Sequence, residues 1–279
     1  MTDRRGNGAV AGAGGSAPAA PAPSPAPSRA RRWLAVWGRN FRVWRKLVGP
    51  ALLGNIGEPL LYLFGLGYGL GVFVGRVQGL DYITFLASGI VCASAMNTAS
   101  FEGMYSAYTR MAVQHTWIGM LTTPLSTADV VVGEALWAAT KSLFSAAAIL
   151  LVAAALGVVH GWAALWVLPL AFLVGLCFGA MALVVTAVAG NYDFFLYYFT
   201  LLLTPMVLLS GVFFPLDQMP RAVQLGAEVL PLSHAVSLVR PLMTGGSLQG
   251  VALHLLVLVA YTGAGLALAT RLVDRRLMS

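Results

Sequence analysis

Six long runs of apolar residues constrain the fold more than any other feature of the sequence. They cover residues 51–72, 82–100, 135–157, 162–188, 194–214 and 251–270. Each run is close to the roughly 20 residues that an α-helix needs to cross the hydrocarbon core of a bilayer. Strands of a membrane β-barrel would instead alternate in polarity over about 10 residues. The runs therefore predict an all-α integral membrane protein with six transmembrane helices.

The distribution of charge supports this prediction and sets an orientation. Charged residues make up only 10% of the 279 residues, against roughly 25% in a soluble domain. The predicted spans divide the 17 Lys and Arg residues between the two sides of the membrane. Fourteen lie on the side that also holds the N-terminus, and three, Arg76, Arg221 and Arg240, lie on the other. Because cytoplasmic segments are rich in Lys and Arg, we expect both termini in the cytoplasm. This orientation explains the net charge of +7, so the charge is no evidence for a nucleic-acid partner.

The N-terminal segment differs in composition from the rest of the chain. Residues 1–28 end in a stretch dense in proline and alanine, SAPAAPAPSPAPS. Such a composition cannot bury an apolar core, so we expect a disordered tail. The membrane domain is then predicted to cover residues 29–279.

Residues 30–48 are typical of an amphipathic helix. Basic residues gather on one face, and aromatic residues recur at helical spacing on the other, namely Trp33, Trp37, Phe41 and Trp44. This pattern favours a helix lying in the membrane plane, with its aromatic side chains in the headgroup layer and its basic side chains toward anionic lipid. The alternative is a helix that packs on a soluble partner.

Two residues of the types Asp, Glu, Lys and Arg lie inside predicted spans. Glu58 falls in the first run and is followed by Pro59. An acid at mid-membrane depth is costly and marks a functional site, whereas an acid at a break before proline can sit near the cytoplasmic interface. Both interpretations of Glu58 stay open from the sequence alone. Lys141 lies about one turn into the third run, and we expect its side chain to snorkel to the inner interface.

Residues 101–128, between the second and third runs, form the longest cytoplasmic loop of the predicted topology. Aromatic residues and methionines interleave there with Arg110, Gln114 and His115. This pattern predicts a short amphipathic helix that either rests on the bilayer or docks onto a partner. The Thr123-Pro124 pair indicates a break, after which Ser126 or Thr127 can cap the next helix.

The segment after the fifth run, which begins SGVFFPLDQMP at residue 210, stays amphipathic to about residue 245. Prolines at 215, 220, 231 and 241 cut it into pieces that are too short to cross a membrane. The pattern favours half-helices that dip into the outer leaflet, where backbone of this kind must be covered by protein or line a cavity. The alternative is a loop that rests on the outer surface and has no part in transport.

Motifs of familiar enzymes are missing from the sequence. The phosphate-binding pattern G-x-x-x-x-G-K-[ST] does not occur, because Thr140 precedes the only lysine that is followed by Ser or Thr. No Cys and His residues have metal-ligand spacing, and neither a G-x-S-x-G nor an H-E-x-x-H motif is present. We therefore expect no catalytic residue, no metal site and no cofactor bound by this chain. Energy for transport would come from another polypeptide.

The sequence resembles the ABC-2 family of exporter permeases. The resemblance rests on Ser210-Gly211-Val212-Phe213-Phe214-Pro215, Pro220 and Leu230-Pro231-Leu232-Ser233-His234, which are similar to the family's motif around its fifth span. It implies two short re-entrant helices between spans 5 and 6. It also implies that residues 30–48 form an interfacial elbow helix and that residues 101–128 contain a coupling helix that docks on an ATPase subunit.

A narrower resemblance, from about residue 30 to the C-terminus, is to permeases of lipooligosaccharide exporters within that family. It is carried by residues 94–97, 99–102, 110–111, 116–117 and 133–141. It implies a permease that moves a lipid-linked or amphipathic molecule, such as a lipochitooligosaccharide, out across the bacterial inner membrane. The implied partners are a second copy of the chain, membrane lipid and a separate subunit that binds ATP.

This resemblance assigns roles to particular residues. The residues expected to contact the ATPase are Arg110, His115, Thr116 and Trp117, and those expected along the substrate pathway are Glu58, Phe213, Phe214 and Pro215.

Two other functions are compatible with the sequence. An ATP-independent carrier or channel would depend on Glu58 and have no ATPase partner. A membrane-anchoring or assembly protein would bind a partner through the inner loop and tolerate replacement of the outer half-helices.

Overall fold

The structure is a computed structural model that describes residues 31–46 and 48–278, without the side chains of residues 48, 50–56, 58 and 278. The predicted disordered tail, residues 1–28, and the side chain of Glu58 lie outside the described part. The prediction for the tail and both interpretations of Glu58 therefore stay predictions.

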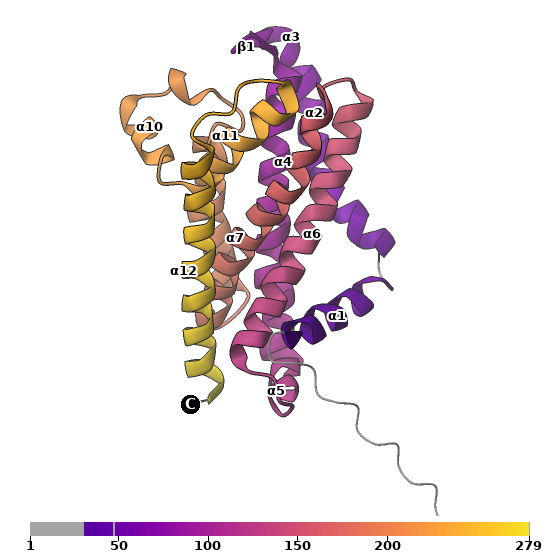
Figure 1. Cartoon of the computed structure of the whole chain (residues 1–279), viewed down its shortest axis with the longest axis vertical. Coiled ribbons are helices and arrows are strands. Elements are labelled where there is room, and N and C mark those ends of the chain that lie inside the picture. The colour runs from indigo at the N-terminus through magenta and orange to yellow at the C-terminus, as the bar shows by residue number, and fades with distance from the viewer. Residues whose placement is uncertain (1–30, 47, 279) are drawn as a thin grey trace, which may run out of the picture.

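Long helices pack side by side along the long axis of the molecule (Figure 1). They are α2 (Val48–Gly69), α4 (Tyr82–Phe101), α6 (Thr127–Ala155), α7 (Val167–Val188) and α12 (Val251–Met278). The short helix η4 (Trp162–Trp166) leads directly into α7. Most of the buried apolar side chains lie between α4, α6 and α7, which makes these three helices the centre of the bundle.

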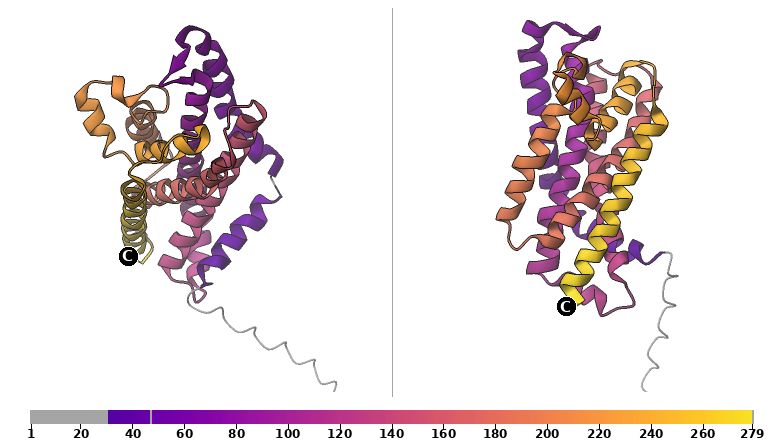
Figure 2. Two further views of the ribbon diagram at one scale, coloured as in Figure 1. Left: turned by 45° about the horizontal axis from the view of Figure 1, so that its top comes forward. Right: turned by 90° about the vertical axis from the view of Figure 1, so that its left-hand side faces the viewer.

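The two ends of the bundle carry different elements, as Figures 1 and 2 show. At one end, here called the α5 end, lie α1 (Trp33–Trp44), α5 (Thr116–Leu121) and the C-terminus. At the other, the α11 end, lie α3 (Gly71–Val74), the two-residue strands β1 (Arg76–Val77) and β2 (Leu80–Asp81), η6 (Leu216–Gln218), α10 (Arg221–Ala227) and α11 (Pro231–Thr244).

By length and composition, the described residues contain four helices able to cross a membrane: Tyr82–Val113, Thr127–Ala155, Trp162–Val188 and Val251–Leu277. A fifth is counted if α10 and α11, which meet at an angle of 87°, form one span. The segments Pro59–Val74 and Asp193–Leu209 are apolar but shorter; the second comprises α8 (Asp193–Tyr198), η5 (Phe199–Leu203) and α9 (Thr204–Leu209). The chain is thus a helical, multi-pass membrane protein, and the count of six spans stays a prediction.

Residues 101–128, predicted as a loop with one short helix, are mostly helical, and α5 is a short helix within them. The helix that begins with α4 continues through two π-helical segments, η2 (Glu102–Ser106) and η3 (Thr109–Val113), before α5 begins. The break at Thr123-Pro124 is confirmed, and α6 begins eight residues before the third apolar run. Ser126 caps α6, since its Oγ accepts the N–H of Asp129 at 3.2 Å and Asp129 accepts the N–H of Ser126 at 2.9 Å.

The helix predicted over residues 30–48 is present as α1, but its aromatic face packs on α6 rather than facing away from the protein. The Trp37 indole donates to Thr140 Oγ1 at 2.9 Å, and Trp44 stacks on Phe144 with centroids 5.0 Å apart. Gly133 permits this approach, because a Cβ there would lie 2.6 Å from the Cβ of Val36. Each of the four aromatic side chains is half-buried by the chain itself, and their position in the headgroup layer stays a prediction.

Candidate functional site

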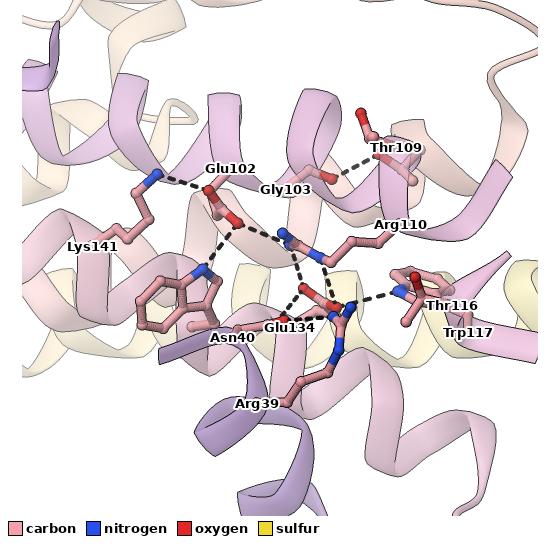
Figure 3. A network of polar contacts seen from close by, with 12 residues as sticks. Arg39, Asn40, Glu102, Gly103, Thr109, Arg110, Thr116, Trp117, Glu134 and Lys141 are labelled. Carbon is pink, nitrogen blue, oxygen red and sulfur yellow. Dashed lines mark hydrogen bonds and ion pairs between the residues drawn. The ribbon is translucent and has the colours of Figure 1, made fainter. Parts of the chain in front are cut away.

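Four charged side chains meet inside the protein near the α5 end (Figure 3). Glu102 and Arg110 come from the π-helical extension of α4, and Glu134 and Lys141 come from α6. We call these four residues the charge cluster. Their side chains are only 1–16% exposed, so the ion pairs are shielded from bulk water.

Arg110 is the centre of the charge cluster. Its Nη2 lies 2.8 Å from Glu102 Oε1, and its Nε donates to Glu134 Oε1 at 3.1 Å. Lys141 Nζ lies 2.8 Å from the second oxygen of Glu102. Two carboxylates therefore balance two cations. Removing one partner of such a buried pair costs about 3–5 kcal/mol, because a charge is left without compensation.

Neutral donors complete the coordination of both carboxylates. The indole N–H of Trp137 donates to Glu102 at 2.9 Å, and that of Trp117 donates to Glu134 at 3.2 Å. The side-chain amide of Asn40, which is buried on α1, donates to Glu134 at 3.0 Å. The hydrogen bonds of Glu134 thus tie α1, α5 and the extension of α4 to α6. A displacement of α5 would therefore act through Glu134 on α1, α6 and the extension of α4.

Sequence reasoning missed Glu102 and Glu134, and it identified Glu58 as the sole acid within a span. One signal was available, because Glu134, Trp137 and Lys141 are spaced i, i+3 and i+7 and share one face of a helix. The position of Arg110 could not be anticipated in the same way. A π-helical turn holds more residues than an α-helical turn and changes which side chains share a face.

The four residues predicted to contact an ATPase lie in different environments. Trp117 is buried beside the charge cluster, and the side chain of Arg110 within the cluster is 13% exposed; their contact with an ATPase stays a prediction. His115 is exposed in a left-handed conformation (φ 51°) at the start of α5, and Thr116 beside it is half-buried. Lys141 also differs from its prediction, because it pairs with Glu102 instead of extending to the interface.

A separate apolar cavity of about 540 Å³ lies between α2, α4, η5, α9 and the turn at residues 210–215. Such a volume is within the range of small-molecule sites. Its wall is mainly aromatic and aliphatic, with Ser94, Asn97 and Thr204 as polar side chains. Phe213 and Phe214, two of the predicted pathway residues, line it together with Pro59, the neighbour of Glu58. Pro215 is buried in the same turn.

The turn at residues 210–215 is held from two sides. Arg240 of α11 donates through Nη2 to the carbonyl of Gly211 at 2.6 Å and through Nε to Ser88 of α4 at 3.0 Å. Gly89 leaves room for the turn, since a Cβ there would lie 2.7 Å from the Cα of Val212. The position of Phe213 and Phe214 at the cavity is therefore fixed by α4 and α11.

The histidines and acids do not form a metal centre within the described ranges, where no group of three or more His, Cys, Asp or Glu residues is placed to hold an ion. His234 and His254 contact each other. Their Nδ1 atoms are 2.7 Å apart and join α11 to α12.

The chain is similar in sequence to known membrane proteins. Residues 31–244 match the ABC-2 type transporter family. Nodulation protein J of Rhizobium leguminosarum bv. viciae is 49% identical over 246 residues, which are 88% of this chain and 95% of the relative. The proteins of the same name from R. leguminosarum bv. trifolii and Rhizobium meliloti (strain 1021) are 48% and 45% identical, each over 88% of this chain and 94% of the relative. The charge cluster and the turn at 210–215 both fall inside the matched residues.

Proposed function

Because this chain belongs to the ABC-2 type transporter family, we propose that it is the membrane permease of an ATP-driven exporter. Its substrate would be a lipid-linked or amphipathic molecule of the lipochitooligosaccharide kind, carried out across the bacterial inner membrane. The observation that carries the proposal is the family match over residues 31–244. A permease of this family works with a separate ATP-binding subunit, which would bind and hydrolyse the ATP.

The proposed topology has six spans and cytoplasmic termini. The first and fifth spans would be α2 and the α8–α9 segment, and the α10–α11 pair with its 87° bend would be re-entrant. The 14 to 3 distribution of basic residues supports placing the α5 end in the cytoplasm. The α11 end, with Arg76 and Arg221, then faces outward.

Two copies of the chain would form the transport unit. Bulky side chains are exposed on α2 and on α8–η5, including Leu61 at 75%, Tyr197 at 61% and Leu201 at 72% exposure. These same elements flank the apolar cavity. A second copy packed against them would close the open side of the cavity, and the substrate would then pass between two such walls.

The ATPase would dock on the exposed part of the η3–α5 turn, where His115 and Ile118 face outward. Trp117 and Arg110 would then transmit the movement without touching the partner. Trp117 is on the same short helix as Ile118 and donates to Glu134, which connects α5 to the charge cluster. We therefore assign contact to His115, Thr116 and Ile118, and positioning to Arg110 and Trp117.

The apolar cavity suits the acyl chain of an amphipathic substrate, because its lining is mostly apolar and its polar groups are few. Phe213 and Phe214, fixed by the turn that contains Pro215, would form the last wall before the outer face. Glu58, one residue before a cavity-lining proline, would lie at the inner part of this pathway.

The test is purification of the tagged chain from native membranes in mild detergent, followed by mass spectrometry of copurifying proteins. We expect a near-stoichiometric soluble subunit with a phosphate-binding loop. Ile118→Asp should lose this subunit, whereas Val229→Asp, which changes a residue 63% exposed at the α11 end, should retain it. Trp117→Phe should retain the subunit but lower substrate export into inverted vesicles. Repeated recovery of a folded chain alone would refute the ATP-driven function and favour a carrier dependent on Glu58.

A further inference from the structure

A second, polar cavity of about 360 Å³ lies at the α5 end, between α1, the π-helical extension of α4, and α6. It lies beside the charge cluster and shares no lining residue with the apolar cavity. Arg39 and Trp44 contribute to it from α1, and Glu102, Arg110 and Lys141 from the charge cluster. We call it the polar cavity.

The lining of the polar cavity carries an excess of positive charge. Three cations, Arg39, Arg110 and Lys141, and one carboxylate, Glu102, line it. Glu134, outside the lining, balances Arg110, so the excess charge is that of Arg39. Arg39 donates to Asn40 Oδ1 at 3.1 Å, and no described carboxylate lies within 4.0 Å of its guanidinium. Burial lowers the pKa of Arg39 below its usual value, against the attraction of Glu134. The site thus holds a partly desolvated cation without an ion-pair partner among the described residues.

Both carboxylates beside the polar cavity already accept three hydrogen bonds or more from the protein. Glu102 accepts from Arg110, Trp137 and Lys141, and Glu134 accepts from Arg110, Trp117 and Asn40. A donor is left over, because the indole N–H of Trp44 is buried and has no acceptor within the described part of the chain. The unused hydrogen-bonding capacity therefore includes a buried donor and an unpaired positive charge, which are groups that bind a phosphate.

We propose that the polar cavity binds the phosphate of an anionic phospholipid from the adjacent leaflet. The surroundings favour a lipid over a free phosphate ion. Apolar Val43 and Trp44 line the cavity next to the cations, and Val43 is also 53% exposed on α1, so an attached acyl chain would have apolar surface to follow. Arg42 and Arg45 on the exposed side of α1 would face the same leaflet.

This inference does not depend on what the protein exports. A lipid bound here would contact α1 and the charge cluster together, and it would stabilise the contact of α1 with the bundle. Arginine suits this role because its planar guanidinium can donate two parallel hydrogen bonds to a phosphate.

The test compares two arginines of the same helix. Arg39→Gln and Arg42→Gln each remove one positive charge from α1, but Arg39 lines the polar cavity whereas Arg42 is exposed and donates to the carbonyl of Gly38. The full-length protein is purified in detergent and stripped of lipid. Its thermal midpoint is then measured with micelles containing phosphatidylglycerol, with micelles containing phosphatidylcholine, and with inorganic phosphate.

We expect phosphatidylglycerol to raise the midpoint, with little effect from phosphatidylcholine or inorganic phosphate. Loss of one charge-assisted hydrogen bond should weaken the lipid affinity of Arg39→Gln by about tenfold or more, and Arg42→Gln should bind as the parent does. Trp44→Phe, which keeps the ring but removes the N–H donor, should also bind more weakly. Each variant is compared with its own lipid-free midpoint, which separates binding from a change in stability.

Three results would overturn the proposal. Equal stabilisation by phosphatidylcholine would indicate a general lipid effect. Equal weakening in Arg39→Gln and Arg42→Gln would indicate attraction to the surface of α1 and no bound phosphate. Full stabilisation by inorganic phosphate, with no further gain from lipid, would assign the cavity to a phosphate ion.

Discussion

The charge cluster makes a quantitative prediction for Glu134→Gln, a substitution that keeps the shape of the side chain and removes its charge. Glu134 accepts from both Nε and Nη2 of Arg110. At a charge separation of about 4 Å and an effective dielectric constant of about 20, this attraction amounts to about 4 kcal/mol. The substitution leaves Arg110 and Lys141 to share Glu102 alone, so the cluster retains one uncompensated positive charge.

We expect Glu134→Gln to destabilise the protein by about 3–5 kcal/mol, the usual cost of removing one member of a buried pair. For chains of 150–250 residues, 1 kcal/mol corresponds to about 2–4 °C in the unfolding midpoint. The expected shift is therefore about 10 °C. It can be measured in detergent as the temperature at which half of the protein no longer elutes as a single size-exclusion peak.

The matched control is Glu228→Gln, because the Glu228 side chain is exposed at the α11 end and should shift the midpoint little. A double variant that adds Arg110→Gln to Glu134→Gln gives a sharper measurement. If the two side chains interact as the structure indicates, the double variant should lose several kcal/mol less than the sum of the single variants. A Glu134→Gln shift no larger than the control, or additive losses, would refute the assignment of a buried ion pair.

Two further predictions concern local packing. Gly89→Ala should lower the unfolding midpoint by an amount corresponding to about 1–3 kcal/mol, because the new Cβ would lie 2.7 Å from the Cα of Val212. The control is Gly119→Ala, which should leave the midpoint unchanged because a Cβ there meets nothing within 4 Å. Equal midpoints for the two variants would contradict the contact between α4 and the turn at 210–215. Ser126→Ala should cost about 1 kcal/mol by removing the cap of α6. Ser126→Thr, which keeps the hydroxyl that accepts from the Asp129 N–H and donates to its carboxylate, should keep most of that stability in the same thermal assay.

Much of the helical framework could be predicted because lipid imposes a simple rule on the sequence. An apolar run of about 20 residues has few alternatives to a helix, and the runs at 162–188 and 251–270 correspond to η4–α7 and α12. The helix at 30–48 was predicted from the spacing of its aromatic residues alone. What that spacing could not show is that the same face would meet α6, because Gly133, which permits the contact, is about 90 residues away in the sequence.

The charge cluster was not predicted because each of its charged residues, considered alone, is unfavourable in a buried helix. Residues 101–113 contain Glu102 and Arg110 and follow the second apolar run, so they were assigned to the loop between two spans. In three dimensions the polar side chains of the α4 extension meet those of α6, so both segments stay helical and buried. Periodicity within a single segment carries no information about such a partner. The apolar cavity could not be located for the same reason, although Phe213 and Phe214 were identified from the motif.

The helix that begins at Tyr82 connects the two ends of the molecule. It runs for 32 residues, to Val113, which corresponds to about 48 Å at the rise of an α-helix. Near one end, Gly89 touches the turn that holds Phe213, and near the other, Arg110 joins Glu134 and through it Trp117 of α5. In the proposed exporter, a partner that displaces α5 would therefore act on the same helix that contacts the aromatic wall of the apolar cavity. Coupling between α5 and the apolar cavity then requires only that this buried helix shift as a unit. Its contacts at the two ends can be altered independently, by Glu134→Gln at one end and Gly89→Ala at the other.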